Sequence, residues 1–192
     1  NVPITANVGN SLAYGNLYFN PGNYAWGFFM RNKLSALDSA GEWYYDPTNG
    51  YLYFWAPNGV NPNTLLVEAS VHDYGVKMGN WSWPINNVSV SNIKFTRQGS
   101  AGVKTEGGCS YISVMGCEFT ELYHGIDSYT ADHNNYDHNT FRDTYASAVH
   151  CFDNNTTIDH NKLNNIALVG GEGESFFGYF GILVSGTGNT VR

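Results

Sequence analysis

Asn92-Ile-Lys-Phe95, Gly116-Cys-Glu-Phe119, His138-Asn-Thr-Phe141 and His160-Asn-Lys-Leu163 share one pattern, and their last residues follow at steps of 24, 22 and 22. Two further patterns keep nearly this spacing. One comprises Gly102-Val103, Gly125-Ile126, Ala148-Val149 and Gly181-Ile182, and the other comprises Val88-Ser-Val90, Ile112-Ser-Val114, Asn134-Asn-Tyr136 and Thr156-Thr-Ile158. Each unit of about 22–24 residues thus holds three short strands separated by turns, with no sustained helical period. Because such a unit cannot bury its inner face alone, the repeat predicts an all-β parallel β-helix, or solenoid.

The same spacing predicts which side chains face the core. Three inward columns are expected: Val90/Val114/Tyr136/Ile158, Phe95/Phe119/Phe141/Leu163 and Val103/Ile126/Val149/Ile182. A fourth is Ile93/Cys117/Asn139/Asn161, in which the last two amides would each bond to the neighbour in the next coil. Cys117 and Cys151 then become small buried thiols. The final step of 33 indicates a Gly-rich insertion near 168–178, and long loops of this kind usually border a binding face.

Residues 1–87 lack this repeat and are expected to form a β-rich segment that leads into coils at 88–192. A hairpin is predicted at 43–55, because aromatic runs flank Pro47-Thr-Asn-Gly50 with Asn-Gly at the turn. Such a hairpin would cover an open end of the solenoid. The end at Gly188-Asn-Thr-Val-Arg192 looks like the opening of another strand, so C-terminal coils are expected to be missing.

The amino-acid composition limits the classes of molecule that this chain can be expected to bind. Charged residues make up 13% of the chain, the formal net charge is −7, and Lys and Arg together number nine. Nucleic acid and anionic membranes need a basic footprint, so neither is expected as a partner, and neutral poly- or oligosaccharides fit better.

No apolar run has transmembrane length. Three irregularly spaced cysteines give neither a disulfide framework nor a zinc pattern. The chain opens on Asn1 without a signal peptide, and it is interpreted as a processed piece of a larger secreted polypeptide.

A family resemblance covers nearly the whole chain. The stretches that carry it are Leu37-Asp-Ser-Ala-Gly-Glu-Trp-Tyr-Tyr-Asp46, Gly50-Tyr-Leu-Tyr-Phe-Trp-Ala-Pro57, Val67-Glu-Ala-Ser70, Asn87-Val-Ser-Val-Ser-Asn-Ile-Lys-Phe95 and Phe180-Gly-Ile-Leu-Val184. They resemble large secreted bacterial right-handed parallel β-helix proteins of the pectate-lyase-like superfamily. The resemblance implies a right-handed solenoid at the bacterial cell surface or outside the cell. It does not fix the chemistry, because relatives include glycoside hydrolases, polysaccharide lyases, epimerases and surface proteins without assigned activity.

Chemistry is expected on the outward face of the strands that carry the Gly-Ile pattern. The outward columns there are Lys104/Asp127/His150/Leu183 and Glu106/Tyr129/Phe152/Ser185. Residues stacked in adjacent coils lie ~4.8 Å apart, so Asp127 could orient the His150 imidazole or form an acid/base pair with it. Lys104 would support the charged carboxylate. Tyr129 and Phe152 would offer sugar rings a flat platform.

A second carboxylate, as glycoside hydrolysis requires, would come from Glu172 and Glu174 on the insertion. The predicted catalytic residues are therefore Asp127, His150, Glu172 and Glu174, and the predicted substrate-binding residues are Lys104, Glu106, Tyr129 and Phe152. Two other interpretations stay open for this face: sugar contact without catalysis, and an ordinary solvated column with chance aromatics.

Three Asp-His dipeptides form a further group: Asp132-His133, Asp137-His138 and Asp159-His160. The last two are 22 residues apart and stack at one turn. Asp and His can bind Zn²⁺ or Ca²⁺. Turns also reuse Asp because its side chain bonds nearby backbone, and the spacing fixes no third ligand, so no metal and no other cofactor is expected, with Ca²⁺ as the alternative. Ca²⁺-dependent lyase chemistry, which the resemblance suggests, would need an acidic cluster beside Arg97, Lys104 or Arg142, and none lines up.

Two functions follow from these observations. The first is an extracellular carbohydrate-active enzyme, a polysaccharide-degrading glycoside hydrolase or a fragment of one, ahead of a polysaccharide lyase. The second is a non-catalytic surface or adhesin module that binds glycans or serves as a rigid spacer.

Overall fold

The computed structural model describes residues 4–9, 11–15, 32–168 and 180–192. Contacts within the chain divide it into two units, Asn1–Val67 and Glu68–Arg192. In its described part, the first unit contains two antiparallel hairpins, β1 (Ile4–Val8) with β2 (Ser11–Tyr14) and β3 (Trp43–Asp46) with β4 (Tyr51–Phe54). It also contains the short 3-10 helices η2 (Leu34–Ala36), η3 (Pro57–Gly59) and η4 (Pro62–Thr64). In the β3–β4 hairpin, Trp43 lies opposite Phe54 and Asp46 opposite Tyr51. Its position over an end of the solenoid stays a prediction.

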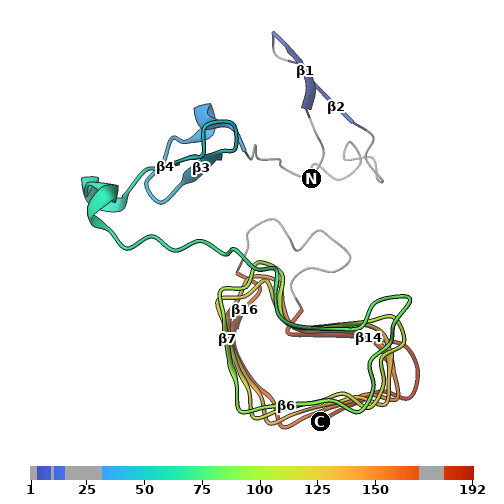
Figure 1. Ribbon diagram of the computed structural model, residues 1–192. Coiled ribbons are helices and arrows are strands. Elements are labelled where there is room, and N and C mark those ends of the chain that lie inside the picture. Colours follow the sequence, from blue (N-terminus) through green and yellow to red (C-terminus); the bar gives the residue numbers. More distant parts are fainter. Residues whose placement is uncertain (1–3, 10, 16–31, 169–179) are drawn as a thin grey trace. The chain divides into compact units, whose positions relative to one another are not determined.

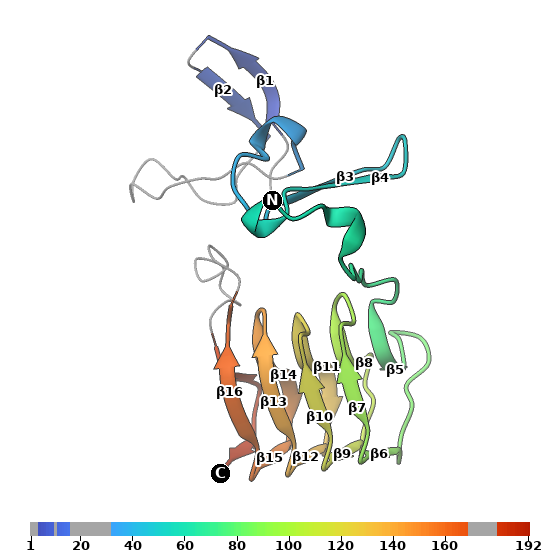
Figure 2. The same cartoon turned by 90° about the vertical axis from the view of Figure 1, so that its left-hand side faces the viewer.

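The second unit is a solenoid of about four turns built from three parallel sheets, which confirms the predicted fold class. The first sheet comprises β5 (Tyr74–Met78), β8 (Ala101–Glu106), β11 (His124–Asp132), β14 (Ser147–Asn154) and β17 (Ile182–Ser185). The second comprises β6 (Ser89–Ser91), β9 (Ser113–Met115), β12 (Asn135–Asp137), β15 (Thr157–Asp159) and β18 (Thr190–Val191). The third comprises β7 (Lys94–Thr96), β10 (Glu118–Thr120), β13 (Thr140–Thr144) and β16 (Lys162–Ile166). Figure 1 looks along the stack of coils, and Figure 2 shows the strands of the third sheet side by side.

The strand register reproduces the repeat spacing. Phe119 pairs with Phe95 on one side and with Phe141 on the other. Val149 pairs with Ile182, so the long final step leaves the register of the first sheet intact. β5 already pairs in parallel with β8, and the first coil therefore begins before the expected boundary at residue 87. The expected insertion at 168–178 lies almost entirely outside the described residues.

The core is a stack of matching side chains. The rings of Phe95, Phe119 and Phe141 lie 5.1 and 4.8 Å apart with nearly parallel planes. Val114, Tyr136, Val103, Ile126 and Val149 have no exposed surface, as the repeat predicted. Cys117 and Cys151 are also buried. Burial of this apolar surface, at about 25 cal/mol per Å², is the main stabilising contribution to the solenoid.

One expectation about the fourth inward column is wrong, and another is met in part. Ile93 is 43% exposed, because it belongs to β6–β7, the terminal coil, which has a neighbouring coil on one side only. Each of the Asn139 and Asn161 side chains does bond to its neighbour in the adjacent coil, but to the backbone of that neighbour and not to its side chain. Oδ1 of Asn139 accepts from the backbone N–H of Cys117, and Oδ1 of Asn161 accepts from that of Asn139, both at 2.9 Å. Each amide thus satisfies a backbone donor at a corner, where the sheet supplies no partner.

A polar cluster that the repeat did not predict lies among these inward side chains. Asp153 is 1% exposed, and its carboxylate accepts from Ser128 Oγ and from the backbone N–H of Ala131. Tyr136 Oη donates to Ser128 Oγ at 2.9 Å. Burial raises the pKa of Tyr136 well above its usual value and also raises the pKa of the Cys151 thiol, so both groups keep their protons at neutral pH.

Candidate functional site

Three polar side chains stack across neighbouring strands on the outer face of the first sheet. Lys104 on β8 pairs in register with Asp127 on β11, which pairs with His150 on β14. Lys104 Nζ lies 2.7 Å from Asp127 Oδ2, and His150 Nδ1 lies 2.7 Å from Asp127 Oδ1. These residues, called the polar column below, are only 10–13% exposed in their side chains. They are therefore not the ordinary solvated column that the sequence left open.

The pKa of Asp127 is set by two opposing effects. Burial alone would raise it, but the hydrogen bonds from His150 and Lys104 outweigh burial and lower the pKa from 3.8 to about 2. Asp127 is thus ionised at neutral pH, with a donor on each carboxylate oxygen. An ionised carboxylate only accepts hydrogen bonds, so Nδ1 of a neutral His150 carries the proton and Nε2 carries the lone pair.

A second histidine adjoins the polar column. The His124 ring stacks on the His150 ring with centroids 5.0 Å apart. His124 is 9% exposed, and its buried Nδ1 has no hydrogen-bond partner in the described part of the chain. Burial lowers the pKa of His124 from 6.5 to about 4, against a smaller opposite effect of the Asp127 charge, so its imidazole is neutral near pH 7.

Aromatic rings lie directly beside the polar column. Tyr129 and Phe152 stack with centroids 5.1 Å apart, and Trp81 packs edge-on against Tyr129 at 6.4 Å. We call these three residues the aromatic row. The Lys104 ammonium lies 5.8 Å from the centre of the Tyr129 ring, and the His150 ring is 4.8 Å from that of Phe152. The aromatic row and the polar column therefore form one continuous surface.

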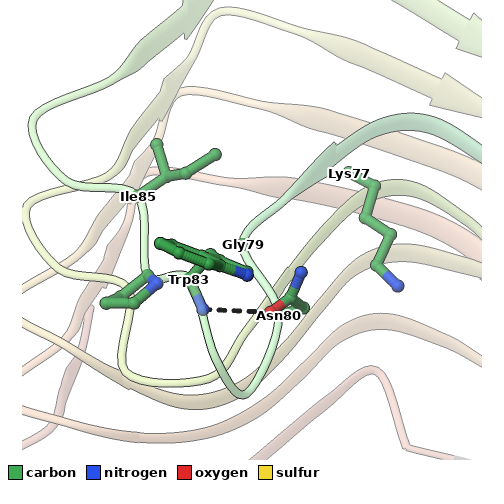
Figure 3. A pocket seen from close by; sticks show the side chains of 6 residues that line it. Lys77, Gly79, Asn80, Trp83 and Ile85 are labelled. Atoms are coloured by element: carbon green, nitrogen blue, oxygen red, sulfur yellow. Dashed lines mark hydrogen bonds between the residues drawn. The ribbon is translucent and has the colours of Figure 1, made fainter.

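A pocket of about 440 Å³ lies next to β5 (Figure 3). It is lined by Lys77, Gly79, Asn80, Trp83, Pro84 and Ile85. The chain turns tightly here, because Asn80 Oδ1 accepts from the backbone N–H groups of Ser82 and Trp83. Trp83 keeps 74% of its surface exposed. The pocket therefore combines an exposed indole with an amide and an ammonium group.

Other predicted site residues have different surroundings. Glu106 on β8 forms an ion pair with Lys77 on β5, with Nζ 2.8 Å from Oε1. The charge of Glu106 is therefore compensated within the sheet. Glu172 and Glu174 lie outside the described residues. Sequence reasoning missed His124, Trp81 and Trp83. One signal could have found His124: it directly precedes Gly125 of the repeated Gly-Ile pattern. The strand register that follows from this pattern places His124 beside the next coil.

The Asp-His dipeptides lie at other corners. Asp132 is the last residue of β11, His133 follows it, and the His133 ring stacks on Tyr111. At the corner between the second and third sheets, one carboxylate oxygen of Asp137 and one ring nitrogen each of His138 and His160 lie within 4.8 Å of one another. The predicted stacking of the last two dipeptides is therefore present, and the structure adds a third potential ligand that the spacing did not fix.

The fold and this face define the class of protein: a right-handed parallel β-helix with an outward polar and aromatic surface. Residues 61–192, more than half of the chain, match the family described as right handed beta helix region, and the chain belongs to that family. No curated protein and no solved structure matches the chain. Among the described residues, no helix is long and apolar enough to cross a membrane.

Proposed function

We propose that this chain is an extracellular or cell-surface bacterial carbohydrate-active protein whose first sheet binds a poly- or oligosaccharide. The observation that carries the proposal is the continuity of the aromatic row with the polar column. Tyr129 and Phe152 stack on each other, and together they would form an apolar surface for the apolar faces of sugar rings. The Lys104 ammonium, 5.8 Å from the centre of the Tyr129 ring, would add a donor for sugar hydroxyl groups.

The same face supports acid/base chemistry. His150 is the group suited to move a proton, because Asp127 is ionised and already accepts from two donors. Asp127 would hold the ring of His150 and favour its protonated form as a positive charge develops, while Lys104 keeps the carboxylate ionised. We propose cleavage of a glycosidic bond as the reaction, with the second carboxylate of hydrolysis coming from Glu172 or Glu174.

One observation favours a second function, glycan binding without cleavage. Both oxygens of Asp127 are engaged, and Glu106 is paired with Lys77, so both carboxylates of this face among the described residues already have cationic or hydrogen-bonding partners. Hydrolysis by two carboxyl groups needs one that donates a proton. A surface module that holds glycans through the aromatic row would need no such group.

Binding is tested first, on an array of neutral poly- and oligosaccharides. Replacing both rings, Tyr129→Ala with Phe152→Ala, should weaken binding by at least tenfold, since each ring that packs against a sugar contributes about 1 kcal/mol. Ser185→Ala is the matched control, because Ser185 is the next residue in register after Phe152 but offers no ring. Equal binding by the double variant and the wild type would contradict the proposed surface.

Cleavage is tested separately by the release of reducing sugar from each bound glycan. His150→Gln and Asp127→Asn should each lower the rate by about 10²-fold or more, the usual contribution of a positioned acid/base group. The control is His133→Gln, which removes a histidine at another corner. Product release at the wild-type rate by both variants would remove the acid/base role, and binding without any product would favour the adhesive module.

A further inference from the structure

Two neighbouring coils carry Asp-His at a corner where the earlier coils carry other residues. In the register of the second sheet, Asp137 and Asp159 follow Ser91 and Met115. The next residue in each coil is then Asn92, Gly116, His138 or His160, and all four have a φ between 49° and 62°. The corner therefore requires a left-handed residue, a conformation that Gly and Asn adopt readily. The backbone conformation of this corner therefore does not explain why two successive coils have histidine there.

The side chains at this corner converge on one point. His138 Nδ1 lies 2.8 Å from Asp137 Oδ1, and His160 Nδ1 lies 3.8 Å from the same oxygen. The two imidazole rings stack at 4.7 Å with planes 17° apart. Because both Nδ1 atoms approach one oxygen, they lie on the same side of the stack. Ligand atoms around a tetrahedral Zn²⁺ at ~2.0–2.1 Å are separated by about 3.4 Å, which is close to these spacings.

A buried carboxylate oxygen adjoins this group. Asp159 is 8% exposed, and its Oδ1 has no hydrogen-bond partner among the described residues, although it lies 3.0 Å from His160 Nδ1. Its other oxygen pairs with Arg192 at 3.1 Å. Two carboxylates and one guanidinium leave this corner with a net negative charge when the imidazoles are neutral. A buried acceptor without a donor is costly, and a cation beside Oδ1 would remove that cost.

We infer that this corner, formed by Asp137, His138, Asp159 and His160, binds a first-row divalent transition metal such as Zn²⁺. Asp137 Oδ1 and the Nδ1 atoms of His138 and His160 would be the ligands, and the Asp159 carboxylate, whose Oδ1 lies 3.0 Å from His160 Nδ1, would add negative charge beside them. Imidazole and carboxylate are the ligand types that Zn²⁺ accepts, whereas Ca²⁺ prefers oxygen alone. The side chains of His138 and His160 are 66% and 65% exposed, so a metal can enter without opening the solenoid. The ion would join two adjacent coils.

The chain offers matched variants for the test. His138→Asn and His160→Asn remove a ligand and keep the turn, because Asn92 occupies the same corner in the first coil. The control is His133→Asn. His133 also follows an aspartate, lies 2.9 Å from Asp132 and has a φ of 52°, but it stacks on Tyr111 instead of on a second histidine. It therefore reproduces the local dipeptide without the ligand from the next coil.

The experiment titrates ZnCl₂ into the 192-residue chain by calorimetry and records the visible absorption with Co²⁺ in place of Zn²⁺. We expect one saturable site, a rise in Tm with Zn²⁺ that chelator reverses, and a loss of more than about tenfold in affinity for His138→Asn and for His160→Asn. His133→Asn should bind as the wild type does. Absence of a saturable site in the wild type, or unchanged affinity in both corner variants, would overturn the inference.

Discussion

His150 Nδ1 lies 2.7 Å from Oδ1 of Asp127, a residue 23 positions earlier in the chain and one coil away in space. The same aspartate reaches Lys104, another 23 positions earlier, through its second oxygen. Three ionisable groups that are distant in sequence are thus brought together by strand register alone. Each coil contributes one group, and the parallel sheet sets their separation at about 4.8 Å.

The ion pair in this column should be strongly coupled. Asp127→Asn leaves the ammonium of Lys104 nearly buried without its counter-charge, and we expect a loss of about 3 kcal/mol in the free energy of unfolding. Lys104→Met should cost less, because His150 still donates to Asp127. The double variant Lys104→Met/Asp127→Asn should be more stable than the sum of the two single losses predicts. Urea unfolding of the four proteins measures this coupling, and strictly additive losses would show that the pair is not coupled.

Repetition explains why so much of this arrangement was predictable. Once the steps of the repeat are fixed, every residue has a known neighbour in the next coil, and the Asp127–His150 and Tyr129–Phe152 pairs follow from counting. The repeat spacing could not predict the hydrogen-bond geometry of the polar column or its near burial, because both depend on side-chain rotamers and on the side chains that cover the column. Counting also failed for Ile93, since the repeat does not say which coil is terminal.

Residues off the strands were harder to predict for a different reason. Trp81 reaches Tyr129 from a tight turn that Asn80 closes, and such a turn has no repeat partner in the other coils. Asp153 sits inside the solenoid, where a charged residue is usually excluded, and is accepted there because Ser128 and Ala131 donate to it. Local hydrogen bonding, which varies from coil to coil, decides both cases.

His124 should make the stability of the solenoid depend on pH. Its pKa is about 4 in the folded chain and near 6.5 when unfolded, so between these values the unfolded chain binds the proton and the folded chain does not. The free energy of unfolding should therefore fall as the pH drops from about 6.5 to 4, by up to about 3 kcal/mol. Asp127, with a folded pKa of about 2, adds a further loss below about pH 4.

Chemical denaturation at pH 7.5 and pH 4.5 tests this dependence. The wild type should lose about 2 kcal/mol between the two conditions through His124, and His124→Gln should lose correspondingly less. His133→Gln serves as the control, because the His133 side chain is 47% exposed and its removal should leave the difference unchanged. An equal loss in His124→Gln and the wild type would assign the acid sensitivity to other groups.

Phe141 and Ile93 should respond very differently to truncation, although the repeat placed both inward. Phe141 has no exposed surface and stacks on Phe119, so Phe141→Ala should cost about 3–5 kcal/mol. Ile93 is 43% exposed in the terminal coil, and Ile93→Ala should cost about 1 kcal/mol or less. Thermal and urea unfolding of the two variants compare the losses, and similar values would mean that Ile93 is buried in solution.

Gly102 and Phe119 illustrate a size rule within each coil. A Cβ added at Gly102 would lie 2.6 Å from Phe119 Cδ1, and one at Gly75 would lie 2.4 Å from Phe95 Cδ1. In the coil β14–β16, however, Ala148 takes the place of this glycine in register and Leu163 takes the place of the phenylalanine. The inner corner therefore accepts either Gly with Phe or Ala with the smaller Leu.

This rule predicts a compensating pair. Gly102→Ala should destabilise the solenoid by about 1–3 kcal/mol, because the methyl group overlaps the Phe119 ring. Adding Phe119→Leu should restore part of that loss, although Phe119→Leu alone also costs stability. Gly99→Ala is the control, since its Cβ would meet nothing closer than 3.6 Å and its φ is not positive. In urea unfolding, the double variant should lose less free energy of unfolding than the sum of the two single losses. A purely additive loss would mean that the backbone around Gly102, such as the carbonyl of Gly125 at 3.0 Å, excludes the methyl group whatever side chain stands at position 119.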